Sequence, residues 1–162
     1  MPRRYQVISV DIAGTRFNLR AAAIIEHEGK VLLHRALSDD FWTLPGGRVE
    51  PGEHAAATVE REMREELDEQ VACGPLLLLA ENFFNYRGKP NHEIGLYFET
   101  RLAANSTLPL RASPFVVHDA GAPLEFVWFD RGQLADLRVL PVEVKDLLLN
   151  DKRNLRQVVN RG

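Results

Sequence analysis

One segment, residues 45–66, constrains this chain more than any other, because a turn rich in proline and glycine leads there into an acidic helix. Gly47 is followed after five residues by Glu53, and after seven more by the sequence Arg61-Glu62-Met63-Arg64-Glu65-Glu66. At helical spacing, Glu62, Glu65 and Glu66 share one face. Like charges placed in this way destabilise a helix by roughly 0.3 kcal/mol per pair. The pattern therefore predicts a bound cation among the carboxylates, and a divalent metal ion is the simplest candidate.

The same helix carries a second, apolar face. The spacing predicts a stripe displaced by roughly a quarter to a third of a turn from the acids, made by Ala56, Val59, Met63 and Leu67. The sequences Pro45-Gly46-Gly47 and Pro51-Gly52 are turn signals that let the backbone approach a ligand closely. One face of the helix is thus expected to pack in a core, while the other presents acid to a cleft.

The pattern from Gly47 to Glu66 resembles the signature of the Nudix hydrolases, which cleave a nucleoside diphosphate linked to another group. The resemblance implies an α/β fold, the family's α/β/α sandwich with a mixed β-sheet, over roughly residues 18–149. Because no long linker or repeat divides the chain, residues 1–162 are expected to form a single domain. The family usually has Gly and an apolar residue where this chain has Asp68 and Glu69. Since Asp tolerates the left-handed conformation needed there, this departure concerns only the helix exit.

The resemblance also implies roles for the signature residues. Glu62, Glu65 and Glu66 are expected to bind the metal ion, with the backbone carbonyl of Gly46 as a further ligand. A set of carboxylates suits Mg²⁺ or Mn²⁺ better than zinc. Such ions bridge the phosphates and lower the pKa of an attacking water. Glu53 and Arg61 are implied to form a pair that holds the loop against the helix.

The general base is left open between several carboxylates. In much of the family it lies outside the signature, and the candidates in this chain are Glu93 and Asp119, which we weigh equally. An exposed loop or strand edge explains either residue as well. Glu66, or Glu53 itself, could activate the water instead.

Substrate contacts are predicted in the segment 81–93. Phe84 and Tyr86 could stack on a base, while Arg87 and Lys89 could contact phosphate. Core packing of Phe83 or Phe84, with a hairpin whose tip is Gly88, explains the same residues. Arg35, which ends a predicted strand, is a further candidate phosphate contact.

The sequence disfavours two substrate classes of the family. The branch of the family that removes oxidised guanine nucleotides generally has an Asn before a Pro ahead of the last helix, whereas Val139-Leu140 precede Pro141 here. RNA 5′-pyrophosphate cleavage would need a basic path that the sequence lacks. We therefore expect a small nucleoside diphosphate derivative. A noncatalytic module that binds a nucleotide or a protein is the alternative, although such a module has little reason to keep the whole acid set.

Composition limits the other function classes. A net charge of -3 provides no global positive field for nucleic acid. No apolar run is long enough to span a bilayer, so we expect a cytoplasmic protein, with a second copy of the chain as a candidate partner. The single cysteine, Cys73, is expected to be a small core residue, and the five histidines show no zinc spacing.

Alternating and apolar runs predict strands at Tyr5–Asp11, Phe17–Glu26, Lys30–Arg35, Leu76–Phe84, Ile94–Arg101 and Phe126–Phe129. Glu28-Gly29 should join the second and third of these. A second helix is predicted over Pro141–Leu149, with Val144, Leu147 and Leu148 facing inward. The pattern as a whole indicates a mixed sheet with helices packed on it.

Overall fold

A computed structural model describes residues 6–118, 121–150 and 154–161. Two α-helices are present in these ranges, α1 (Ala55–Leu67) and α2 (Glu143–Asn150), with two 3₁₀ helices, η1 (Leu108–Leu110) and η2 (Arg131–Asp136). The strands are β1 (Ser9–Ile12), β2 (Thr15–His27), β3 (Lys30–Ala36), β4 (Gly46–Arg48), β5 (Val71–Tyr86), β6 (Lys89–Leu102), β7 (Phe115–His118), β8 (Pro123–Asp130) and β9 (Arg156–Asn160).

The strands form one mixed sheet in the order β7-β8-β3-β2-β6-β5-β9, with β1 and β4 paired to β2 outside this path. β2 pairs with β6 in parallel and with β3 and β4 in antiparallel orientation. Residues 21–25 of β2 are all buried, because this strand is covered on both faces. The predicted mixed sheet is confirmed.

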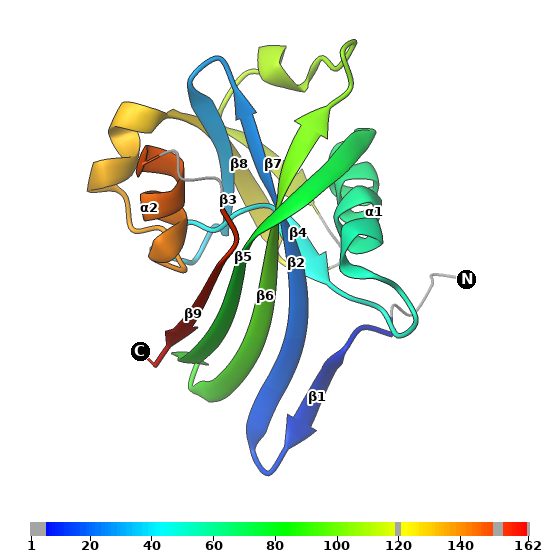
Figure 1. Ribbon diagram of the computed structural model, residues 1–162, viewed down its shortest axis with the longest axis vertical. Coiled ribbons are helices and arrows are strands. Elements are labelled where there is room, and N and C mark those ends of the chain that lie inside the picture. The colour runs from blue at the N-terminus through cyan, green and yellow to red at the C-terminus, as the bar shows by residue number, and fades with distance from the viewer. Residues whose placement is uncertain (1–5, 119–120, 151–153, 162) are drawn as a thin grey trace.

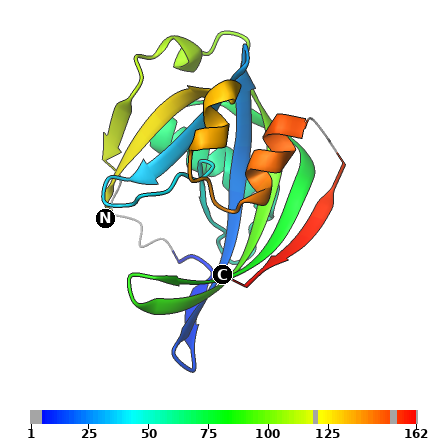
Figure 2. The ribbon, with the colours of Figure 1, turned by 90° about the vertical axis from the view of Figure 1, so that its left-hand side faces the viewer.

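The two helices lie on opposite faces of the sheet (Figures 1 and 2). Val59, Met63 and Leu67 of α1 pack with Ala21 and Ala23 of β2 in one core. A second core, on the other face, contains Val144, Leu147 and Leu148 of α2 with Ala22 and Ile24 of β2. Alternate residues of β2 therefore serve opposite cores, as the period of two in a strand requires.

Helix α1 ends at the residue where the sequence departs from the family pattern. Asp68 has φ 53° and ψ 39°, the left-handed conformation. The amide of Asp68 donates to the carbonyl of Arg64, and that of Glu69 donates to the carbonyl of Met63. The last turn of the helix is thus capped without glycine.

Several element boundaries differ from the sequence prediction. β5 and β6 are longer than predicted, since backbone pairing continues through polar residues to a tight turn at Arg87 and Gly88 (φ 50° and 78°). The strands β4, β7 and β9 were missed because they are short, and β4 is mostly glycine. α2 begins at Glu143 rather than Pro141. Part of the predicted strand Tyr5–Asp11 lies outside the described residues.

Candidate active site

Arg61 is the centre of an ionic network that joins α1 to the loop before it. Its side chain is only 9 % exposed. The guanidinium donates to both carboxylate oxygens of Glu53, from Nε at 2.8 Å and from Nη2 at 3.1 Å. Nη1 donates to Glu62 at 2.9 Å and to Glu65 at 3.2 Å, and Nη2 donates to the carbonyl of Arg48 at 3.1 Å. The predicted pair of Glu53 and Arg61 is thus present as a bidentate ion pair that also reaches β4.

Both carboxylate oxygens of Glu53 accept hydrogen bonds from other groups of the protein. Besides Arg61, the hydroxyl of Thr58 donates to it at 2.6 Å and the amide of Glu50 donates at 3.2 Å. The hydrogen bonds from Arg61 are the main reason why the pKa of Glu53 falls to about 2. A carboxylate held in this way is a weak base and a firm anchor for the loop.

The glycine loop lets β4 approach the acidic face of α1. A Cβ atom at Gly47 would stand 2.3 Å from Cδ of Glu62, so only glycine fits there without displacing Glu62. Burial raises the pKa of Glu62, although its carboxyl also contacts Glu66 and Arg61. Two carboxylates in contact need a shared proton or cation between them. The arrangement therefore favours a positive ion at Glu62 and Glu66.

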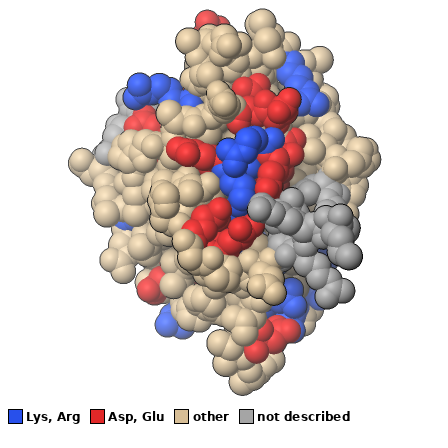
Figure 3. Space-filling view, turned by 90° about the vertical axis from the view of Figure 1, so that its right-hand side faces the viewer, with Lys and Arg blue, Asp and Glu red and all other residues tan. Residues whose placement is uncertain are grey.

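The surface that carries α1 has a mixed charge pattern. Figure 3 shows acidic side chains grouped around a basic cluster in the middle of this face. An acidic rim with basic groups inside it suits a ligand that brings both metal ions and phosphates.

The other face of the sheet carries a second polar group, made by Arg16, Arg20, Arg48 and Glu93. Arg20 of β2 stands opposite Arg48 of β4, and Asn18 stands opposite Glu93 of β6. Because Arg20 alternates with Ala21, and Ala21 packs against α1, these side chains belong to the α2 face. Burial is the main reason why the pKa of Arg48 is lowered, and the charges of Arg16 and Arg20 lower it further. The charge of Glu93 partly offsets this repulsion, and a bound anion would offset it further.

Arg20 is held in place by neighbours that carry no charge. Its Nη2 donates to the carbonyl of Leu44 at 2.9 Å and lies 3.4 Å from Nε2 of His34. Burial lowers the pKa of His34 to about 3, so the ring is neutral and can accept this contact. The hydrogen bonds of Arg20 thus go to neutral groups, and Glu93 is a carboxyl on the same face on which its charge acts.

Comparison with known protein families shows a match between residues 16–149 of this chain and the sequence model of the NUDIX domain. The chain belongs to the Nudix family. It is 46 % identical over 57 residues to the CTP pyrophosphohydrolase of Escherichia coli K12, a match that covers 33 % of this chain and 42 % of that protein. The chain thus matches less than half of the length of this relative.

Solved structures show the same fold. A Nudix hydrolase from Nitrosomonas europaea is similar at a TM-score of 0.62 and 18 % identity, over 88 % of this chain and 78 % of that one. The E. coli ORF135 protein is similar at a TM-score of 0.50 and 25 % identity, over 86 % of this chain and 91 % of that one. The predicted α/β Nudix-type fold is confirmed.

Members of the Nudix family generally use divalent metal ions, and the acidic face of α1 fits such an ion. Glu62, Glu65 and Glu66 offer only oxygen atoms as metal ligands, and all three lie on one face of α1. A hard cation prefers oxygen ligands. In the part of the chain that the structure describes, no three acidic, His or Cys side chains converge as a closed metal site. Nη1 of Arg61 instead donates to both Glu62 and Glu65, so these carboxylates would have to share their oxygens between Arg61 and an ion.

The predicted substrate contacts of this Nudix chain fall into two groups. Phe84 and Tyr86 lie on the same face as Glu93, because Asn82 stands opposite Glu93 and these residues follow it at intervals of two. Phe84 is 38 % exposed, whereas the hydroxyl of Tyr86 donates to the carboxylate of Asp39. Their role in substrate binding stays a prediction.

The predicted phosphate contacts are engaged in ion pairs. Lys89 lies 2.9 Å from Asp11, and Arg87 lies 3.9 Å from Asp39. Arg35 pairs with Glu125 at 3.0 Å and lies over the ring of Trp42. Any of these cations would have to exchange a protein carboxylate for a phosphate.

Sequence reasoning missed Arg16, Arg20 and Arg48 as a group. The alternation Arg16-x-Asn18-x-Arg20 places polar side chains on one face of a strand, and that signal was available. The contribution of Arg48 depends on the pairing of β4 with β2, which no local pattern predicts. Asp119, the other predicted loop base, lies outside the described residues.

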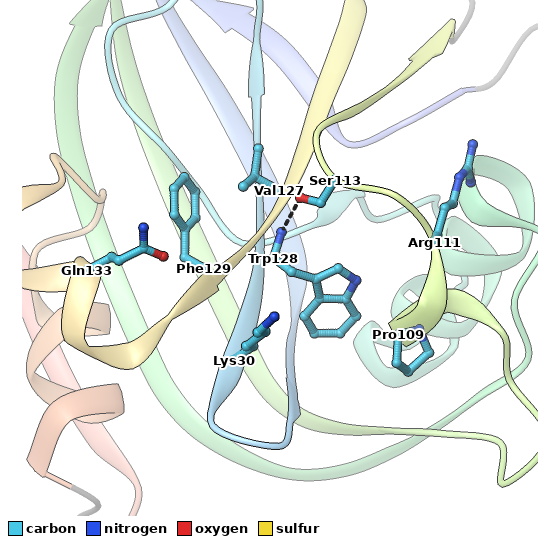
Figure 4. Close-up of a pocket in the computed structure, with 8 residues that line it drawn as sticks. All are labelled: Lys30, Pro109, Arg111, Ser113, Val127, Trp128, Phe129 and Gln133. Atoms are coloured by element: carbon cyan, nitrogen blue, oxygen red, sulfur yellow. Dashed lines mark hydrogen bonds between the residues drawn. The ribbon is translucent and has the colours of Figure 1, made fainter.

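A separate hollow of about 390 Å³ lies beside β8 (Figure 4). Lys30, Arg111 and Trp128 line it, and the amide of Trp128 donates to Ser113 there. It contains none of the predicted site residues.

Two smaller predictions can be compared with the structure. Cys73 is half-buried beside the α1 core, and burial raises its pKa to about 11, as expected for an unreactive thiol. Neither helix in the described ranges is long and apolar enough to cross a membrane.

Proposed function

We propose that this Nudix protein hydrolyses a pyrophosphate bond in a nucleoside diphosphate linked to another group, with Mg²⁺ or Mn²⁺. The observation that carries the proposal is the network around Arg61, which joins the glycine loop, Glu53 and the acidic face of α1 into one unit. A module that only binds a ligand has little reason to keep the whole set of acidic residues.

In this mechanism, Glu62, Glu65 and Glu66 would hold the metal ion, and the carbonyl of Gly46 is a further candidate ligand. A bound ion would supply positive charge near the phosphates and would make the attacking water more acidic. Arg61 keeps the helix and the loop at a fixed separation through Glu53 and the carbonyl of Arg48. The carboxylates are thus oriented before the substrate arrives, which lowers the reorganisation needed in the reaction.

The contacts of the candidate carboxylates favour one of them as the general base in this proposal. Glu53 is occupied by Arg61 and Thr58, and Glu93 lies on the sheet face away from α1. Glu66 is itself a proposed metal ligand, and its carboxyl lies beside that of Glu62. We therefore place the base on Glu66 among the described residues and keep Asp119 as the loop alternative.

The substrate is proposed to be a nucleotide of small size. The E. coli relative is named as a CTP pyrophosphohydrolase, and the matched segment is 57 residues long. Arg20 and Arg48, together with Arg16, which also pairs with Asp11 at 3.5 Å, provide local positive charge on a chain with a net charge of -3. This local charge suits the phosphates of a single nucleotide better than a long polyanion.

The test is phosphate and pyrophosphate release from a panel of nucleoside triphosphates and nucleoside diphosphate sugars, with and without Mg²⁺. Glu66→Gln is the active-site variant, and Glu60→Gln, an exposed change on the same helix, is the matched control. We expect Mg²⁺-dependent turnover by the parent and by Glu60→Gln only. Nucleotide binding without turnover on any substrate in the panel would instead favour the noncatalytic module.

A further inference from the structure

Glu93 is a half-buried carboxyl whose acceptors are largely unused inside the protein. It lies in the first half of β6, opposite Asn18 of β2 and Asn82 of β5. Among the described residues its hydrogen-bond partner is the side chain of Asn82, and Arg20 and Arg48 act on it through their charges. A carboxylate has about four acceptor positions, so most of the hydrogen-bonding capacity of Glu93 remains for a ligand.

Its position does not suit a base that serves the α1 carboxylates. Gly47 of β4 stands opposite Ala21 and contacts Glu62, which places the acids on the α1 face. Glu93 and Arg20 belong to the α2 face, because residues opposite each other in the sheet share a face. The backbone layer of the sheet therefore separates Glu93 from the predicted metal ligands.

The surroundings of Glu93 contain the groups that a nucleoside needs. Phe84, two residues after Asn82, offers a 38 % exposed ring on the same face. Such a ring can stack on any base. Arg48 lies at the edge strand β4, two strand spacings or about 10 Å from β6. A ligand with its phosphates at β4 and its nucleoside over β6 would meet Arg48, Glu93 and Phe84 together.

We propose that Glu93 is a specificity-determining residue, which accepts hydrogen bonds from two neighbouring donors on the nucleoside part of the substrate. The donors are either the amino and imino groups at the edge of a base or the 2′,3′-diol of a ribose. This proposal rests on the proposed function for the nature of the substrate. Burial also raises the pKa of Glu93, and a ligand that donates to the carboxylate would offset this cost.

The experiment compares the parent with Glu93→Gln and Glu81→Gln. Glu81 is half-buried in β5 opposite Ile94, so its side chain lies on the other face and it is the matched control. Binding of cytidine, uridine, adenosine and guanosine monophosphates, and of their 2′-deoxy forms, is measured by calorimetry in EDTA. Values of kcat and KM for the corresponding triphosphates are measured with Mg²⁺. Thermal melting shows that each variant is folded.

We expect the parent and Glu81→Gln to prefer one class of nucleotide by about tenfold or more, and Glu93→Gln to lose that preference. Loss of the ribose preference alone identifies the diol as the donor pair, and loss of the base preference identifies the base edge. Preference in binding without any hydrolysis contradicts the proposed function but supports this role of Glu93. An unchanged preference in Glu93→Gln, a parent that does not discriminate, or an equal fall of kcat for all nucleotides would overturn the inference.

Discussion

Replacement of Arg61 by alanine tests whether the network holds the active site together or only contacts substrate. The change leaves Glu53, Glu62 and Glu65 without the cation that they share, and the Arg61 and Glu53 side chains are only 9 % and 15 % exposed. Removal of one partner from a buried ion pair costs about 3–5 kcal/mol. Because Glu65 is 33 % exposed and can be hydrated, we take the lower limit of about 3 kcal/mol.

This loss is large enough to measure in the melting temperature. For a chain of this length, each kcal/mol lowers Tm by about 2–4 °C, so Arg61→Ala should lower Tm by about 6–12 °C. Arg64→Ala is the matched control on the same helix, since Arg64 is exposed, and it should change the stability by less than about 0.5 kcal/mol. The measurements are calorimetric Tm and kcat/KM at saturating Mg²⁺. A variant with the Tm of the parent and a raised KM alone would place Arg61 on phosphate and refute the structural role.

The network also predicts how stability depends on pH. The pKa of Glu53 is about 2 in the folded protein and near 4.5 when it is unperturbed. The stabilisation is therefore complete above about pH 4.5 and is lost as the pH falls towards 2. At 1.36 kcal/mol per pKa unit, reduced for solvent screening, it amounts to about 2 kcal/mol. The Tm difference between the parent and Arg61→Ala should shrink over this interval, and a constant difference would contradict the assignment.

Three further changes test the remaining parts of the site. Glu66→Gln removes charge at nearly constant shape and should lower kcat by about a hundredfold or more with Tm preserved; equal turnover at saturating Mg²⁺ would rule out the metal assignment. Gly47→Ala should displace the side chain of Glu62, so the rate should fall at least about tenfold while Tm changes little. Wild-type activity in this variant would show that the close approach of Gly47 to Glu62 is unimportant. Asp68→Gly relieves a left-handed φ of 53° and should raise the stability by about 0.5 kcal/mol in urea unfolding, whereas a loss of stability would contradict the strain.

The acidic helix could be predicted because its information is local. The spacing of Val59, Met63 and Leu67 fixes the buried face, and the spacing of the glutamates then fixes the exposed one. The pair of Glu53 and Arg61 followed from the family pattern and is present as a bidentate contact. These features depend on residues within one turn and one helix.

The face on which Glu93 lies could not be predicted, because it depends on pairing between distant strands. Glu93 stands opposite Asn18, 75 positions earlier in the sequence (93 − 18 = 75). A shift of one residue in that register would turn Glu93 towards α1. The alternating pattern of a strand shows which residues share a face but leaves open which face is which. Glu93 was therefore a reasonable base candidate from sequence and becomes a recognition residue in our interpretation of the structure.

The short strand β4 links the two faces and explains why both carry parts of one proposed site. Successive residues of β4 face opposite sides of the sheet. Gly47 therefore contacts Glu62 on the α1 face, while Arg48 lies with Arg20 on the α2 face. The backbone carbonyl of Arg48 also accepts a hydrogen bond from Arg61. A ligand bound at this edge would lie beside both the acidic helix and Arg48. Loss of Arg61 should therefore disturb nucleotide binding on the α2 face as well as catalysis on the α1 face, because both depend on the position of β4.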